Sequence, residues 1–170
     1  GRIRAGDDNY NDLSPLDLIF VSETNRSPNA LVAAVQHLNV ADTENLRYQP
    51  TEKDGQTRTF CNIFLADIMR QMFPYHPEVV PTHWREVDEP QQDGSIRRVQ
   101  KEMRANDYAR WFRSGEARSL GWLMITESEA RAYADRGIPV AVTMESIQGD
   151  VPGHVMIGVP SPKNAEKRGL

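Results

Sequence analysis

The chain has 170 residues, of which 39% are hydrophobic, and it carries a formal net charge of −4 at pH 7. This length supports one hydrophobic core but is short for two domains, so we expect a single domain. The weak acidity excludes a general electrostatic attraction to nucleic acid or to anionic membranes, and no apolar run approaches the roughly 20 residues of a membrane span. We therefore expect no nucleic acid and no membrane among the partners.

The amino-terminal residues 1–15 are rich in Gly, Asp and Asn, a composition typical of a linker or an arm. They lack the apolar stretch of a signal peptide. The sequence therefore predicts a linker or arm over 1–15 and one folded domain over 16–170.

Two segments carry the signals of helices. Ser27-Pro28 places a capping residue before a proline in the first helical position, and apolar residues follow at helical spacing to about Val40. Thr126 and Glu129 fit a capping box, which predicts another helix that stops at Gly137.

The middle of the chain has weaker signals. Residues 73–95 are rich in proline and predict a long irregular excursion over the surface, while 95–105 favour no element. Asn106 can cap a short helix that ends near Gly115, and the apolar run 120–126 is compatible with a short strand.

Two valine-rich runs near the carboxyl terminus, 138–143 and 153–159, predict an antiparallel hairpin joined by 148–152. Alternation along the second strand puts His154 on the face opposite to the apolar core face. Because Gly158 has no side chain, this face leaves room for a packed helix. We expect the helix that carries the cysteine to pack there.

Cys61 is the only cysteine, and it begins a segment that predicts a central helix. Thr59 can cap this helix, apolar residues cover most of its circumference, and Pro74 stops it. A thiolate at a helix amino terminus is stabilised by the helix dipole and by unpaired N–H groups. The position predicts a nucleophilic cysteine; the alternative is a buried cysteine that only fills the core.

A nucleophilic cysteine needs a base within hydrogen-bond reach, and the chain offers His37, His76, His83 and His154. We choose His154 because it opens a strand directly after a glycine, where another group can approach closely. A zinc site made by Cys61, His76 and His83 is an alternative, but the spacing of seven between these histidines matches no compact ligand motif. The sequence thus predicts a thiolate–imidazolium pair of Cys61 and His154, with no metal and no other cofactor.

The order of these motifs resembles bacterial and phage cell-wall hydrolases, namely the CHAP and NlpC-type amidohydrolases of the papain-like superfamily. The resemblance covers roughly residues 45 to 160, and its most telling parts are the Cys-Asn helix start and the Gly-His strand. The segments that carry it are Tyr48-Gln49-Pro50, Thr59-Phe60-Cys61-Asn62-Ile63-Phe64, His83-Trp84, Ala105-Asn106-Asp107-Tyr108, Trp111-Phe112, Gly121-Trp122, Gly137-Ile138-Pro139-Val140 and Gly153-His154-Val155-Met156-Ile157-Gly158-Val159-Pro160.

The resemblance implies a papain-like α+β fold, with amino-terminal helices and the cysteine helix packed on a small antiparallel sheet that carries the histidine. It also implies a cysteine peptidase or amidase that hydrolyses amide bonds in the peptide part of peptidoglycan. Cys61 would attack the amide carbonyl, and His154 would protonate the leaving amine. The bond would be either one within the stem peptide or the amide between sugar and peptide.

In these families a third polar residue orients the histidine, usually from the following strand. Asn164 and Glu166 are the candidates that the remaining sequence offers, and the alternatives are an orienting residue from elsewhere or a dyad.

Oxyanion and substrate contacts are expected from the residues around the cysteine. Tyr48 and Gln56 precede Cys61 at suitable distances, Asn62 follows it, and Trp84 lies in the proline-rich segment, where it can line a groove. The segments 41–58 and 73–95 are the expected groove walls.

Two other functions stay open at this point. One is a papain-like toxin that deamidates or cleaves a host protein, and the other is a non-catalytic module that binds the cell wall or an inhibitor. The expected partners are a peptidoglycan stem peptide and an immunity or inhibitor protein. The expected location is the bacterial cell wall or periplasm, reached by secretion or by delivery as an antibacterial effector.

Overall fold

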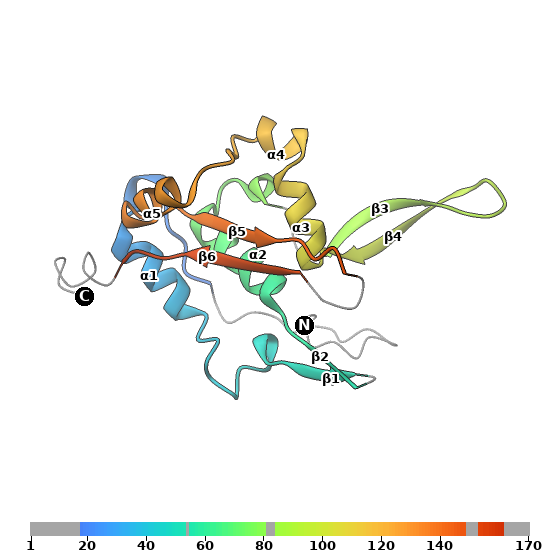
Figure 1. Cartoon of the computed structure of the whole chain (residues 1–170), viewed down its shortest axis with the longest axis horizontal. Coiled ribbons are helices and arrows are strands. Elements are labelled where there is room, and N and C mark those ends of the chain that lie inside the picture. The colour runs from blue at the N-terminus through green and yellow to red at the C-terminus, as the bar shows by residue number, and fades with distance from the viewer. Residues whose placement is uncertain (1–17, 54, 81–83, 149–152, 162–170) are drawn as a thin grey trace.

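A computed structural model describes residues 18–53, 55–80, 84–148 and 153–161, so the predicted linker 1–15 lies outside the described residues (Figure 1). The described part is α+β, as expected, with five α-helices and three antiparallel two-stranded hairpins. The helices are α1 (Pro28–His37), α2 (Cys61–Met72), α3 (Ala105–Phe112), α4 (Gly115–Ser119) and α5 (Glu127–Asp135). The hairpins are β1 (Thr51–Lys53) with β2 (Gln56–Arg58), β3 (Trp84–Pro90) with β4 (Ile96–Glu102), and β5 (Val140–Met144) with β6 (His154–Gly158).

The two helices with strong amino-terminal signals form as predicted. The Ser27 hydroxyl accepts a hydrogen bond of 3.0 Å from the N–H of Ala30 at the start of α1. At α5 the capping box is complete, because the Thr126 hydroxyl accepts from the Glu129 N–H at 3.3 Å and the Glu129 carboxylate accepts from the Thr126 N–H at 3.1 Å. Helix α1 ends at His37, slightly earlier than predicted.

Helix α2 is the centre of the core, because its buried residues belong to two clusters. One cluster joins α2 to α3 and β6, and the other joins α2 to α1. Burial of these side chains supplies the main driving force for folding, about 1.5–3 kcal/mol for each large apolar residue. The first cluster includes Leu65, Met69, Tyr108, Trp111 and Val155, and the second includes Val21, Leu31, Leu38, Ile68 and Met72.

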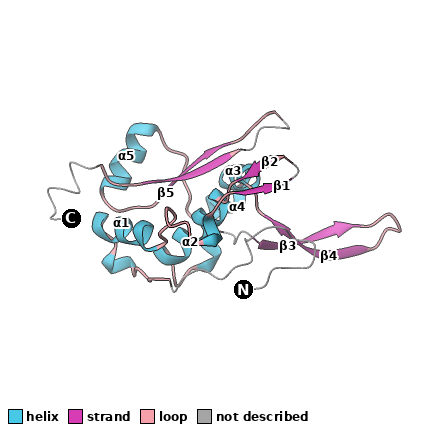
Figure 2. Ribbon diagram, turned by 90° about the horizontal axis from the view of Figure 1, so that it is seen from below, coloured by secondary structure: helices cyan, strands magenta, loops and turns pink. Residues whose placement is uncertain are grey.

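The two faces of β6 carry different helices. Val155 is buried in the cluster with α2, whereas Gly158 lies against α5: a Cβ built on Gly158 would be 3.6 Å from the Cβ of Ala134. Figure 2 shows α1 and α2 on one side of the β5–β6 hairpin and α5 on the other. The prediction that the cysteine helix packs on the face of Gly158 is therefore wrong, and α5 takes that place.

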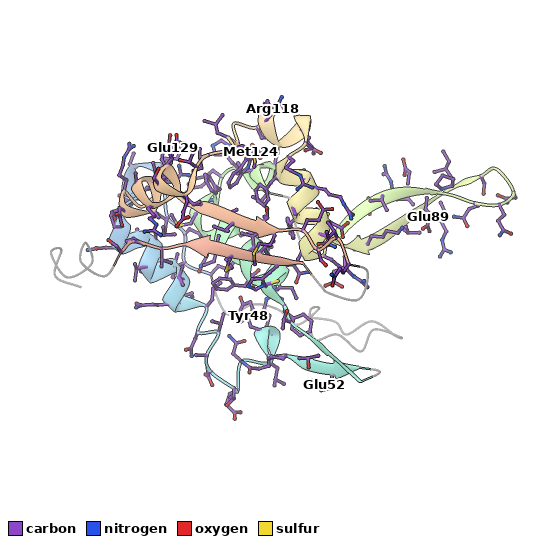
Figure 3. All side chains as sticks on the ribbon, viewed as in Figure 1. Tyr48, Glu52, Glu89, Arg118, Met124 and Glu129 are labelled. Atoms are coloured by element: carbon purple, nitrogen blue, oxygen red, sulfur yellow. The ribbon has the colours of Figure 1, made fainter. Side chains whose placement is uncertain are left out.

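The β3–β4 hairpin projects from the body of the protein and was not predicted (Figure 1). The expected irregular excursion over 73–95 is instead a short 3-10 turn at Pro77–Val79 followed by strand β3. Cross-strand ion pairs hold the hairpin, with Lys101 Nζ at 3.0 Å from Glu89 Oε1 and Arg98 Nε at 3.3 Å from Asp88 Oδ1. Figure 3 shows Glu89 on the projecting part, away from the body.

Two further expectations for the middle of the chain are wrong. Helix α3 begins one residue before Asn106, so the residue at the cap position is Arg104, whose backbone N–H donates to Asp107 Oδ2 at 2.9 Å. The run 120–126 forms no strand, because its residues pair with no neighbouring strand. In the described ranges, no helix combines the length and the apolar character that crossing a membrane requires.

Candidate active site

Cys61 occupies the first position of α2 and is partly exposed. The residue before it, Phe60, is the amino-terminal cap, and its side chain accepts no hydrogen bond from the first turn. The predicted cap by Thr59 is therefore wrong. Because first-turn N–H groups have no partner within a helix, the uncapped start leaves donors beside the thiol.

His154 is the first residue of β6, is half-buried, and pairs with Met144 across the hairpin. Helix α2 and strand β6 begin near the same short segment of chain: Asn62 donates to the carbonyl of Met103, and Asn106, three residues further on, lies against Gly153. Cys61 itself packs against the cluster that contains Val155, the neighbour of His154. The two predicted catalytic residues thus start two elements at the same end of the fold. Alternation along β6, however, puts the His154 side chain on the face of Gly158, opposite the face of Val155 on which α2 packs. Within the described residues, no hydrogen bond joins their side chains.

Asn62, the next residue of α2, is 4% exposed and faces the junction between β4 and α3. Its Nδ2 donates to the carbonyl of Met103 at 2.8 Å and to Glu102 Oε1 at 3.0 Å. The amide nitrogen of Asn62 is therefore bound within the protein.

Tyr48 belongs to a buried polar cluster that supports α2 from the side. Its hydroxyl donates to Asp67 Oδ2 at 2.6 Å, and Arg47 donates to both oxygens of Asp67 from Nε at 2.7 Å and from Nη2 at 3.0 Å. Asp67 is fully buried and Arg47 is 4% exposed. Burial, and after it the charge of Asp67, raises the pKa of Tyr48 above its ordinary value.

Four other predicted site residues have no described side chain. Gln56 lies in β2 and Trp84 opens β3, opposite Glu102, but only their backbone is described. Asn164 and Glu166 lie outside the described residues.

A residue that the sequence did not single out for the site lies against Gly153, the residue before His154. The Oδ1 of Asn106, on α3, accepts a hydrogen bond of 3.0 Å from the N–H of Ser146, just after β5. The same oxygen would be 2.1 Å from a Cβ on Gly153, the residue before His154. The sequence signal for this contact was the glycine itself, which indicates a close approach by another group.

Neither of two hollows in the described surface is lined by Cys61 or His154. The larger has a volume of about 820 Å³, and it is an apolar groove between the segment 120–127, helix α5 and strand β5. Figure 3 shows Met124 above this strand. The smaller, of about 380 Å³, lies between the root of the β3–β4 hairpin and α3.

In the part of the chain that the structure describes, no group of three or more His, Cys, Asp or Glu side chains is arranged to hold a metal ion. A comparison of the whole sequence and structure with protein-family models, curated proteins and solved structures gives no match.

Proposed function

We propose that this protein is a cysteine hydrolase that cleaves amide bonds in the peptide part of bacterial peptidoglycan. The observation that carries the proposal is that α2 and β6, which begin with Cys61 and His154, start beside the same segment, residues 102–106. The pair requires the His154 side chain, at the first position of the strand, to turn toward α2. The choice of peptidoglycan rests on the resemblance of the motif order to cell-wall amidohydrolases.

In the first step, the thiolate of Cys61 attacks the amide carbonyl carbon, and the carbonyl π electrons move to the oxygen. N–H groups at the uncapped start of α2 donate to this oxyanion, each donor contributing about 3 kcal/mol to the transition state. The imidazolium of His154 then protonates the amide nitrogen, the C–N bond breaks, and the amine leaves. The product is a thioester on Cys61.

In the second step, water hydrolyses the thioester. Neutral His154 takes a proton from the water while its oxygen attacks the acyl carbon, and the carboxylic product leaves as the C–S bond breaks. The thiolate–imidazolium pair is thereby restored. The cycle consumes one water and needs no group from outside the chain.

A digestion experiment tests the proposal. Purified sacculi are incubated with wild type, Cys61→Ala, His154→Ala and His76→Ala, and released fragments are separated by mass. His76→Ala is a matched control, because His76 is half-exposed and pairs with Glu23 and Glu78 on the surface. We expect fragments from wild type and from the control only. Absence of fragments with wild type, or their release by Cys61→Ala, contradicts the proposal.

Alkylation with iodoacetamide tests the pair without a substrate. A thiolate held by an imidazolium reacts well below pH 8, the range in which an ordinary thiol begins to react. We expect wild type and His76→Ala to react rapidly at pH 6, and His154→Ala to react only at higher pH. Equal rates for wild type and His154→Ala at pH 6 contradict a pair between these residues.

A further inference from the structure

The junction between β4 and α3, residues 102–106, contacts the sequence neighbours of both proposed catalytic residues. At one end, Asn62 follows Cys61 and donates to the carbonyl of Met103 at 2.8 Å. At the other end, Asn106 contacts Gly153, which precedes His154. A stretch of five residues therefore links two halves of the site that are far apart along the chain.

The contact at Gly153 is close enough to exclude any side chain. A Cβ there would lie 2.1 Å from Asn106 Oδ1 and 2.7 Å from the carbonyl oxygen of Met144, both shorter than real Cβ contacts. Asn106 of α3 and Met144 at the end of β5 therefore both pack against Gly153, the residue before β6. Because the space is filled, Gly153 has little freedom to shift.

Asn106 also binds the chain just after β5, at the other end of the connection between β5 and β6. Its Oδ1 accepts from the N–H of Ser146, two residues beyond the end of β5. One side-chain amide thus touches the chain both where it leaves β5 and where it enters β6. Asn106 is itself held in place, because Tyr108 and Trp111 in the following turn of α3 are buried in the core.

We propose that Asn106 is a positioning residue for the hydrolase: it fixes the start of β6, and the β4–α3 junction with Asn62 relates that start to Cys61. The inference rests on the proposed function. Asn106 acts through the backbone of Gly153 and Ser146, and it fixes the place from which the His154 side chain must reach Cys61. A displacement of about 1 Å between reacting groups lowers rates by as much as 10²-fold.

The test is the pH profile of Cys61 alkylation by iodoacetamide, measured with the melting temperature of each variant. Asn106→Ala and Asn106→Ser remove or shorten the acceptor, and serine is well tolerated near a helix start. Asn106→Asp keeps an acceptor oxygen at the same distance. Asn45→Ala is the matched control, because Asn45 Nδ2 donates to the carbonyl of Leu38 at 2.8 Å, beyond the end of α1.

We expect Asn106→Ala and Asn106→Ser to lose on the order of 10- to 100-fold in alkylation rate at pH 6 and to approach His154→Ala. Asn106→Asp should react at least as fast as wild type, and Asn45→Ala should melt earlier with an unchanged pH profile. If folded Asn106→Ala or Asn106→Ser keeps the wild-type profile, the positioning role is overturned.

Failure of the proposed function gives a different result. In that case wild type and His154→Ala have the same profile, and no pair exists for Asn106 to position. If instead His154→Ala loses the fast reaction and the Asn106 variants keep it, the pair stands and only the role of Asn106 falls. A loss of rate in Asn45→Ala equal to that in Asn106→Ala also overturns the role, because it assigns both losses to stability.

Discussion

The Tyr48 hydroxyl donates a 2.6 Å hydrogen bond to Asp67 Oδ2, in the middle of the helix that begins with Cys61. Tyr48 therefore supports α2 rather than offering its hydroxyl to a substrate. We expect Tyr48→Phe to lower the free energy of unfolding by about 1.5–3 kcal/mol, the range for a hydrogen bond to a charged group. Urea denaturation measures this loss, and the alkylation rate of Cys61 at pH 6 should stay at the wild-type value. A slower alkylation with unchanged stability would instead place Tyr48 in the catalytic machinery.

Stability should fall at alkaline pH, and Tyr48 should account for part of the fall. Burial raises the pKa of Tyr48 and of Tyr108 above the ordinary value of 10.0, so both stay protonated in the folded protein when the unfolded chain has released their protons. The stabilisation is complete below about pH 10 and declines as the pH rises further, by about 1.4 kcal/mol per pH unit for each tyrosine. Unfolding free energies between pH 8 and 11.5 should therefore decline less steeply in Tyr48→Phe than in wild type. Identical slopes would contradict the prediction.

Removal of one partner of the buried ion pair of Arg47 and Asp67 should destabilise the protein strongly, whereas replacement of both partners by apolar residues should not. Asp67→Ala leaves a buried guanidinium without its bidentate partner, and we expect a loss of about 3–5 kcal/mol in unfolding free energy. The double variant Arg47→Met with Asp67→Leu removes both charges and should recover most of that loss. Urea denaturation measures the free energy of unfolding of the single and the double variant. A double variant as unstable as Asp67→Ala would show that shape, not charge, governs this site.

Glycine is required at 137 much more strongly than at 94. Both residues have a positive φ, 81° at Gly137 and 83° at Gly94, which costs a residue with a Cβ about 1–2 kcal/mol. Open space surrounds Gly94, whereas a Cβ on Gly137 would lie 2.1 Å from the backbone carbon of Ser27. We expect Gly94→Ala to cost about 1 kcal/mol and Gly137→Ala about 4 kcal/mol or more, because the start of α1 must move. Thermal or urea denaturation measures both, and equal losses would contradict the packing of α5 against α1.

Local signals suffice to predict α1, α5 and the β5–β6 hairpin, because a cap, a proline or a valine-rich alternation depends on neighbours in sequence. The β3–β4 hairpin has no such signal. Both of its faces are largely exposed, so charged residues such as Asp88 and Arg98 occupy positions where alternation would place apolar ones. Its strands are joined by cross-strand pairs, which can be identified only when the register is known.

The candidate pair could be named from residue type and position, since a helix start and a strand start are both local features. The partners of the surrounding polar residues could not. The Tyr48 hydroxyl binds Asp67, which is 19 residues away in sequence, and the Asn62 amide binds Met103, which is 41 residues away. Both contacts within the protein therefore depend on the folded structure. Asn106 escaped selection for the same reason: its contacts with Ser146 and Gly153 depend on how α3 meets the β5–β6 hairpin.

Amide hydrogens of the projecting β3–β4 hairpin should exchange with solvent faster than those of the core. Its strands make extensive contacts only with each other, and a two-stranded hairpin alone is marginally stable in water, so its amides exchange by local fraying from the tip at Gly94. The amides of α2 and β6 are buried in the core and exchange only when larger units open. The hairpin meets the core at Glu102, whose carboxylate accepts a hydrogen bond from Asn62 at 3.0 Å. We therefore expect the fast exchange of the hairpin to end at Glu102, the side chain that binds the residue after Cys61.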